Sequence, residues 1–131
     1  MTQPNPIQND NPSIHDLVMV DLNPEDRLTI NELKRRKIKG IETYRTILQA
    51  NNGRDAFQDA IDELADAVVY LRQIIEEGKD DHQILYCYQS TIHNLQLLLA
   101  IQSKRNDLQK KIPTVDPSKT IPYLQEGLKR P

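Results

Sequence analysis

The sequence has few of the residues that several kinds of site require. It contains one cysteine, Cys87, so it can form neither an internal disulfide nor a cysteine-based zinc site. The four glycines of this 131-residue chain do not form a glycine-rich phosphate loop of the Rossmann or Walker type. These absences exclude P-loop ATP chemistry, and nothing in the sequence requires an oxidising compartment.

Long apolar stretches and targeting signals are also missing. The longest aliphatic run extends only from Leu97 to Ile101, which is too short to cross a bilayer. Residues 1–6 lack the basic and apolar regions of a secretory signal. We therefore expect a cytoplasmic protein without a membrane partner.

Aromatic residues are also few, and the net charge is small. Aromatics make up 5% of the chain, with no Trp and one Phe, so the core must consist mainly of Leu, Ile, Val and Ala. This composition favours helices over sheets. Seventeen Lys and Arg against nineteen Asp and Glu give a net charge of -2, which argues against a nucleic-acid partner. The length suits a single domain.

Apolar residues recur at three- and four-residue spacing in four segments, which predicts four helices. Capping and turn residues mark their ends. Gly40, within the second segment, predicts a kink or a close approach by another group. The expected helices are 14–21, from Asn23-Pro24 to about 49, from the turn at 51–53 to Gly78, and from Asp80 or Asp81 to Ile112.

The proposed organisation follows from these helices. Residues 1–12 are rich in Pro, Asn and Gln and predict a flexible arm, 13–112 form the helical domain, and 113–131 form an extended, proline-containing tail. The expected fold is all-α: an antiparallel bundle of three long helices plus a short N-terminal helix. Long amphipathic faces in so small a unit predict completion by homo-oligomerisation, as a homodimer or homotetramer.

Four carboxylates share one face of the third helix, opposite its apolar stripe: Asp59, Asp62, Glu63 and Asp66. No Lys or Arg occurs over residues 55–70, so nothing on the helix itself compensates this charge. One interpretation is a solvated face. The other is a binding site for a hard cation, Mg²⁺ or Mn²⁺. Such a site implies a phosphate ester as the substrate.

Three segments in order carry a resemblance to a known family. They are the Gly-Ile-x-x-Tyr segment at 40–49, Asn-Gly-Arg-Asp at 52–55, and Glu-x-x-Asp at 63–66. Over about residues 13–77 the chain resembles the MazG-like all-α nucleoside triphosphate pyrophosphohydrolases, particularly the small phage-type members. The resemblance implies an oligomeric helical bundle and Mg²⁺-dependent (or Mn²⁺-dependent) hydrolysis of a nucleoside triphosphate, with a dNTP as the favoured class, to the monophosphate and pyrophosphate.

The candidate site residues follow from the acidic face and this resemblance. Glu42, Glu63 and Asp66 are the expected metal ligands. Glu63, Asp59 and Asp62 are the expected catalytic carboxylates, with Asp59 or Asp62 as a ligand or general base. The candidate substrate-binding residues are Lys39 and Arg36 for phosphate, Tyr44 and Tyr70 for the base, and Asn52 and Arg54 in the connecting turn. Each has a structural alternative: a solvated basic face, packed tyrosines, or turn and cap residues.

The chain also departs from the family pattern. Ile38 and Lys39 stand where two acids of the family's Glu-Glu-x-x-Glu motif are expected, and Tyr44-Arg45 replaces Tyr-Gly. A nucleotide-binding or sequestering protein that has lost turnover is therefore the alternative function. A purely structural oligomerisation module is the third.

Overall fold

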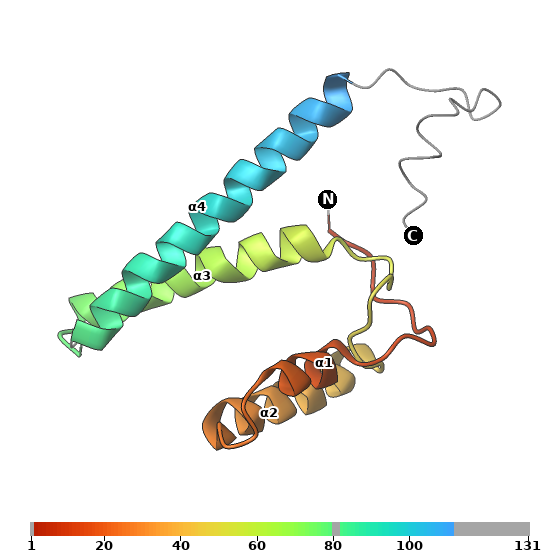
Figure 1. Ribbon diagram of the computed structural model, residues 1–131, viewed down its shortest axis with the longest axis horizontal. Coiled ribbons are helices and arrows are strands. Elements are labelled where there is room, and N and C mark those ends of the chain that lie inside the picture. Colours follow the sequence, from red (N-terminus) through yellow and green to blue (C-terminus); the bar gives the residue numbers. More distant parts are fainter. Residues whose placement is uncertain (1, 80–81, 112–131) are drawn as a thin grey trace. The chain divides into compact units, whose positions relative to one another are not determined.

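The computed structural model describes residues 2–79 and 82–111, and within these ranges the chain is helical, without strands (Figure 1). This confirms the predicted all-α class. The chain divides into two units, Met1–Asp59 and Ala60–Pro131. The predicted tail at 113–131 and the predicted cap at 80–81 lie outside the described residues. The helices are α1 (Ile14–Asp21), α2 (Arg27–Tyr44), α3 (Ala56–Glu76) and α4 (His82–Lys111).

Helix α1 has the bounds that its sequence predicts. Ser13 caps it, because the hydroxyl accepts a hydrogen bond from the Asp16 backbone N–H at 3.4 Å. Lys37 of α2 donates to both Asp16 carboxylate oxygens, at 2.9 and 3.0 Å. This ion pair joins α1 to α2 within the first unit.

Helix α2 begins later than predicted. Asn23 does not cap this helix. The Asn23 side-chain oxygen accepts a hydrogen bond from Glu25 N at 3.0 Å, and the Asn23 backbone carbonyl accepts one from Asp26 N at 2.9 Å. These two bonds close a turn. Asp26 is the cap, since its carboxylate accepts from Thr29 N at 3.2 Å. The prediction of a start at Asn23-Pro24 was wrong because the sequence offers two capping residues three positions apart.

Helix α2 also ends earlier than the predicted residue 49. Arg45 adopts a left-handed conformation with φ 61°, and its N–H donates to the Ile41 carbonyl at 2.8 Å. The chain then runs back past the start of α1, where Ile14 N donates to Leu48 O at 2.8 Å. Ser13 and Gln49 form an isolated antiparallel bridge. The Leu48 carbonyl is thus satisfied by the start of α1 rather than by α2.

Gly40 lies inside α2, and a Cβ added there would meet no atom within 4 Å among the described residues. The close approach that Gly40 predicted as one alternative is therefore not made by this part of the chain.

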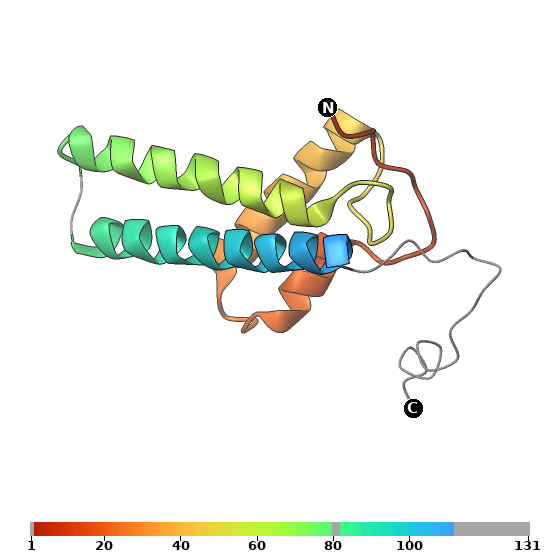
Figure 2. The same ribbon diagram turned by 90° about the horizontal axis from the view of Figure 1, so that it is seen from above.

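Helices α3 and α4 belong to the second unit from Ala60 onward. Gly78 (φ 71°) ends α3 as predicted, with Gly78 N donating to Ile75 O and Lys79 N to Ile74 O. The Arg72 guanidinium of α3 lies 5.9 Å from the centre of the Tyr88 ring of α4, a cation–π contact. The two helices are neighbours at this point (Figure 2).

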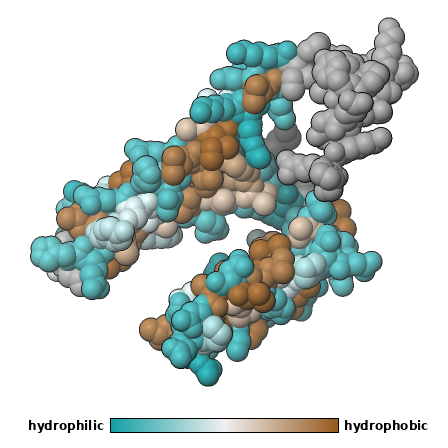
Figure 3. Space-filling view, viewed as in Figure 1, coloured by the Kyte–Doolittle hydropathy of each residue, from teal (hydrophilic) through white to brown (hydrophobic). Residues whose placement is uncertain are grey.

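Few apolar side chains are buried. Ile61 is the one buried hydrophobic residue among those described, with 7% of its surface exposed. Apolar side chains reach the surface over helices of both units (Figure 3). In the described ranges, none of the helices combines the length and apolarity needed to cross a membrane.

Candidate functional site

Residues 3–11, which we call the strap, pair with the loop formed by residues 46–55. Ile7 N donates to Asn52 O at 2.8 Å, and the Asn9 carboxamide donates to Ala50 O at 2.9 Å. The composition of this segment predicted a flexible arm, because it has little apolar surface to bury. The structure differs because Asn and Gln side chains supply the contacts through hydrogen bonds to backbone.

Gln49 is the main loop residue in this pairing and is buried, with 5% of its surface exposed. Its side-chain oxygen accepts from Asn9 N at 3.0 Å. Its nitrogen donates to Asn9 O and Asn11 O, both at 2.6 Å. The carboxamide therefore binds the backbone of the strap much as a neighbouring strand would.

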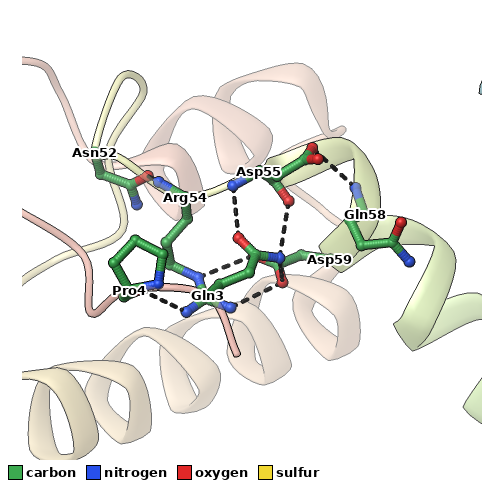
Figure 4. Close-up of polar contacts among 7 residues, drawn as sticks. All are labelled: Gln3, Pro4, Asn52, Arg54, Asp55, Gln58 and Asp59. Atoms are coloured by element: carbon green, nitrogen blue, oxygen red, sulfur yellow. Dashed lines mark hydrogen bonds and ion pairs between the residues drawn. The ribbon is translucent and has the colours of Figure 1, made fainter. Parts of the chain in front are cut away.

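Arg54 and Asp59 form the centre of the candidate site (Figure 4). Arg54 Nε lies 3.0 Å from Asp59 Oδ2, and Arg54 Nη2 lies 2.8 Å from Asp59 Oδ1. Nη1 of the same guanidinium donates to Pro4 O of the strap at 2.9 Å. The bidentate bond to Asp59 raises the pKa of Arg54, so this residue stays cationic.

Gln3 connects the strap to the start of α3. Its side-chain oxygen accepts from Asp55 N at 2.6 Å, and its nitrogen donates to Asp59 Oδ1 at 2.9 Å. Asp55 in turn caps α3 by accepting from Gln58 N at 3.1 Å. Neither Gln3 nor Gln49 was assigned a role from the sequence. Gln49 is the last residue of the family-like segment at 40–49, but an isolated amide has no characteristic spacing that would indicate its contacts.

Two of the predicted substrate-binding residues come together here. Asn52 is buried and accepts from Arg54 N through its side-chain oxygen at 3.1 Å, which is the turn role considered for it. Arg54 and Asp59 face each other as an ion pair. Asp59, expected as a ligand or base, has both oxygens engaged by Arg54 and Gln3.

The other predicted residues lie on helices. Glu42 is exposed on α2, and Asp62, Glu63 and Asp66 are exposed on α3. Glu63 and Asp66 make no ion pair with any described residue and lie one helical turn apart. No cluster of three or more His, Cys, Asp or Glu side chains suited to a metal ion was found in the described ranges.

The basic run of α2 is partly paired. Arg35 bonds to Glu32, and Lys37 pairs with Asp16, whereas Arg36 and Lys39 are exposed and form no ion pair within the described ranges. Tyr44 and Tyr70, the candidates for base stacking, are 49% and 63% exposed. These four side chains have the accessibility that a substrate-binding role requires.

Comparisons of the chain with protein families, with curated proteins and with solved structures find no match. The family resemblance therefore rests on the three segments at 40–49, 52–55 and 63–66.

Proposed function

We propose that the protein is a cytoplasmic, Mg²⁺- or Mn²⁺-dependent pyrophosphohydrolase of the MazG-like type. It cleaves a nucleoside triphosphate, a dNTP in the first instance, to the monophosphate and pyrophosphate. The observation that carries the proposal is the exposed Glu-x-x-Asp pair on α3, Glu63 and Asp66, which follows the two other family-like segments in order. These two carboxylates lie one turn apart and make no ion pair with any described residue. No described cation therefore compensates their charge.

The donor set suits a magnesium ion. Mg²⁺ is usually held by one or two carboxylates, with waters and substrate phosphates filling the remaining positions. Glu63 and Asp66 supply two such groups on α3, and Glu42 stays the third ligand that the sequence predicts. When bound, the metal polarises a phosphoryl oxygen and neutralises its developing charge.

We assign the general base to Asp62, which is exposed on α3 beside the proposed ligand Glu63; both Asp59 oxygens are engaged by Arg54 and Gln3. Asp62 would take the proton of the water that attacks the α-phosphorus. The new P–O bond replaces the bond to pyrophosphate, which leaves with its electron pair. Arg36 and Lys39 are the proposed contacts to the triphosphate, and Tyr44 and Tyr70 those to the base.

The test is pyrophosphate release from a panel of dNTPs and NTPs with Mg²⁺ or Mn²⁺. Glu63→Gln and Asp66→Asn should each lower kcat/KM by more than about 100-fold, the upper end for residues that only support a metal ligand. Glu76→Gln is the matched control, since Glu76 lies on α3 but pairs with Arg72. Absence of release from every nucleotide, or full activity in both ligand variants, would contradict the proposal.

One observation favours a second function, nucleotide binding without turnover. Exposed Ile38 and Lys39 of α2 stand where two further acids are expected, so α2 supplies fewer carboxylates than the family pattern. Saturable nucleotide binding in calorimetry without pyrophosphate release would identify this function. Rapid turnover would exclude it.

We further propose that the working form is a homodimer or homotetramer whose subunits complete an antiparallel bundle. The support is the shortage of buried apolar side chains, since Ile61 alone is buried among the described ones. A folded domain of this size needs more apolar burial than this to offset its loss of conformational entropy.

A further inference from the structure

Every nitrogen of the Arg54 guanidinium already has an acceptor. Nε and Nη2 donate to the two carboxylate oxygens of Asp59, and Nη1 donates to Pro4 O (Figure 4). A phosphate group binds arginine through the same donors. In this conformation Asp59 occupies the Nε and Nη2 edge of Arg54, so a phosphate group cannot form the same two parallel bonds to Arg54 until Asp59 is displaced.

The strap fixes both members of this ion pair. Pro4 O holds the guanidinium, and the Gln3 carboxamide donates to Asp59 Oδ1 at 2.9 Å while it accepts from Asp55 N. Without the strap, Arg54 and Asp59 would be a more exposed pair five residues apart. Such pairs contribute little stability and yield readily to a competing anion.

The strap itself is bound mainly through polar contacts. Gln49, Asn9 and Asn11 provide most of its hydrogen bonds to the loop. Ile7, the one large apolar side chain of the strap, is 67% exposed. Hydrogen bonds of this kind are individually weak, and segments with little buried apolar surface open locally at low cost. We therefore expect that the strap can detach from the loop while the helices stay folded.

We propose that the strap is an autoinhibitory latch: docked, it keeps Arg54 bound to Asp59, and a polyphosphate must displace it to reach Arg54. The inference rests on the proposed function, because it takes the polyphosphate to be that of the nucleotide substrate. Phosphate binding and strap docking are then mutually exclusive. By linkage, each weakens the other by the same factor.

The first test follows the strap by hydrogen–deuterium exchange at the Ile7 and Asn9 amides, which the docked strap protects. Inorganic tripolyphosphate, added without metal to the full chain, should speed their exchange by at least roughly threefold, the equivalent of losing one hydrogen bond. Unchanged or slower exchange at a concentration that saturates binding would overturn the proposal.

The second test measures the reciprocal effect. Gln3→Ala removes the strap's bonds to Asp55 and Asp59 and should bind tripolyphosphate roughly threefold to tenfold more tightly in calorimetry. Gln8→Ala is the matched control, because Gln8 is an exposed strap residue with no hydrogen bond to a described residue. Gln49→Glu, whose carboxylate would face the carbonyls of Asn9 and Asn11, releases the strap from its other end and should act in the same direction.

The outcomes separate the latch from the function. Equal tripolyphosphate affinity in wild-type, Gln3→Ala and Gln49→Glu proteins overturns the latch but leaves the hydrolase proposal standing. If tripolyphosphate binds none of them, the latch is overturned because Arg54 receives no phosphate. The pyrophosphate-release assay alone then decides the hydrolase proposal.

Discussion

Arg45 occupies a backbone conformation that suits glycine. Its φ of 61° ends α2, and the left-handed region costs a residue with a side chain about 1–2 kcal/mol. Glycine, which the MazG-like pattern places here, avoids that cost but loses more chain entropy on folding. Arg45→Gly should therefore raise the free energy of unfolding by about 1 kcal/mol in urea denaturation.

Asn51→Gly is the control for this prediction. Asn51 also has a positive φ, 56°, but asparagine adopts this region more readily than arginine does. Its gain should be smaller than that of Arg45→Gly. A loss of stability in Arg45→Gly would show that the Arg45 side chain makes a stabilising contact in the assembled protein.

His15 should make the stability of the first unit depend on pH. Its Nδ1 is buried and has no hydrogen-bond partner among the described residues. Burial lowers the pKa of His15. The positive charges of Lys37 and Arg36 lower this pKa further, and the negative charge of Asp16 partly opposes them. The folded state therefore favours the neutral ring. The unfolded chain takes up a proton below pH about 6.5, the ordinary histidine pKa, before the folded protein does.

Stability contributed by neutral His15 is thus present above pH about 6.5 and is lost as pH falls through the lower folded pKa. Thermal melts between pH 7 and 5 should show a falling Tm. His15→Gln should flatten this slope, whereas His93→Gln, at an exposed position on α4, should keep it. Identical slopes in wild-type and His15→Gln proteins would refute the assignment.

At the scale of elements, a substitution at Gly40 tests whether another group packs against this side of α2. A Cβ at this position meets nothing within 4 Å among the described residues. Gly40→Ala should therefore stabilise α2 by about 0.5–1 kcal/mol, because alanine loses less entropy in a helix. Urea denaturation would measure the gain.

Gly78→Ala is the control of opposite sign. A Cβ at Gly78 would also meet nothing within 4 Å among the described residues, but the φ of 71° is strained for alanine, so this variant should lose stability. Destabilisation by Gly40→Ala instead would mean that a partner packs against Gly40 in the assembly.

The helix bounds show what sequence patterns could predict. Ser13 and Gly78 each stand alone at a helix end, so α1 and the end of α3 were predicted correctly. Asn23 and Asp26 compete as caps for α2, and only the geometry of the turn decides between them. The end at Arg45 was missed because arginine carries no signal for a left-handed conformation; the glycine that the MazG-like pattern places at this position is such a signal.

The candidate site was predictable only in part. The carboxylates of α3 follow from helical periodicity, which places Glu63 and Asp66 on one face. The strap contacts join Gln3 to Asp59 and Asn9 to Gln49 across some forty or more positions of sequence. Such long-range amide pairs depend on the backbone path, which no local pattern specifies, so composition alone predicted a flexible arm.

At the scale of the whole molecule, α4 presents an apolar stripe. Tyr86, Leu97, Ile101 and Leu108 share one helical face and are 71%, 49%, 44% and 60% exposed. A row of large apolar side chains along a helix of 30 residues is the usual contact surface between helices. It is therefore the surface through which we expect a second copy of the chain to bind.

Light scattering after size exclusion should accordingly give the mass of a homodimer or homotetramer, with a Tm that rises with protein concentration. Ile101→Glu places a charge within the stripe and should shift the mass toward the monomer, because an unpaired charge is costly to bury. Ser103→Glu adds the same charge to another face of α4 and should leave the mass unchanged. A monomeric wild-type protein at every concentration, or an equal effect of both variants, would rule out this interface.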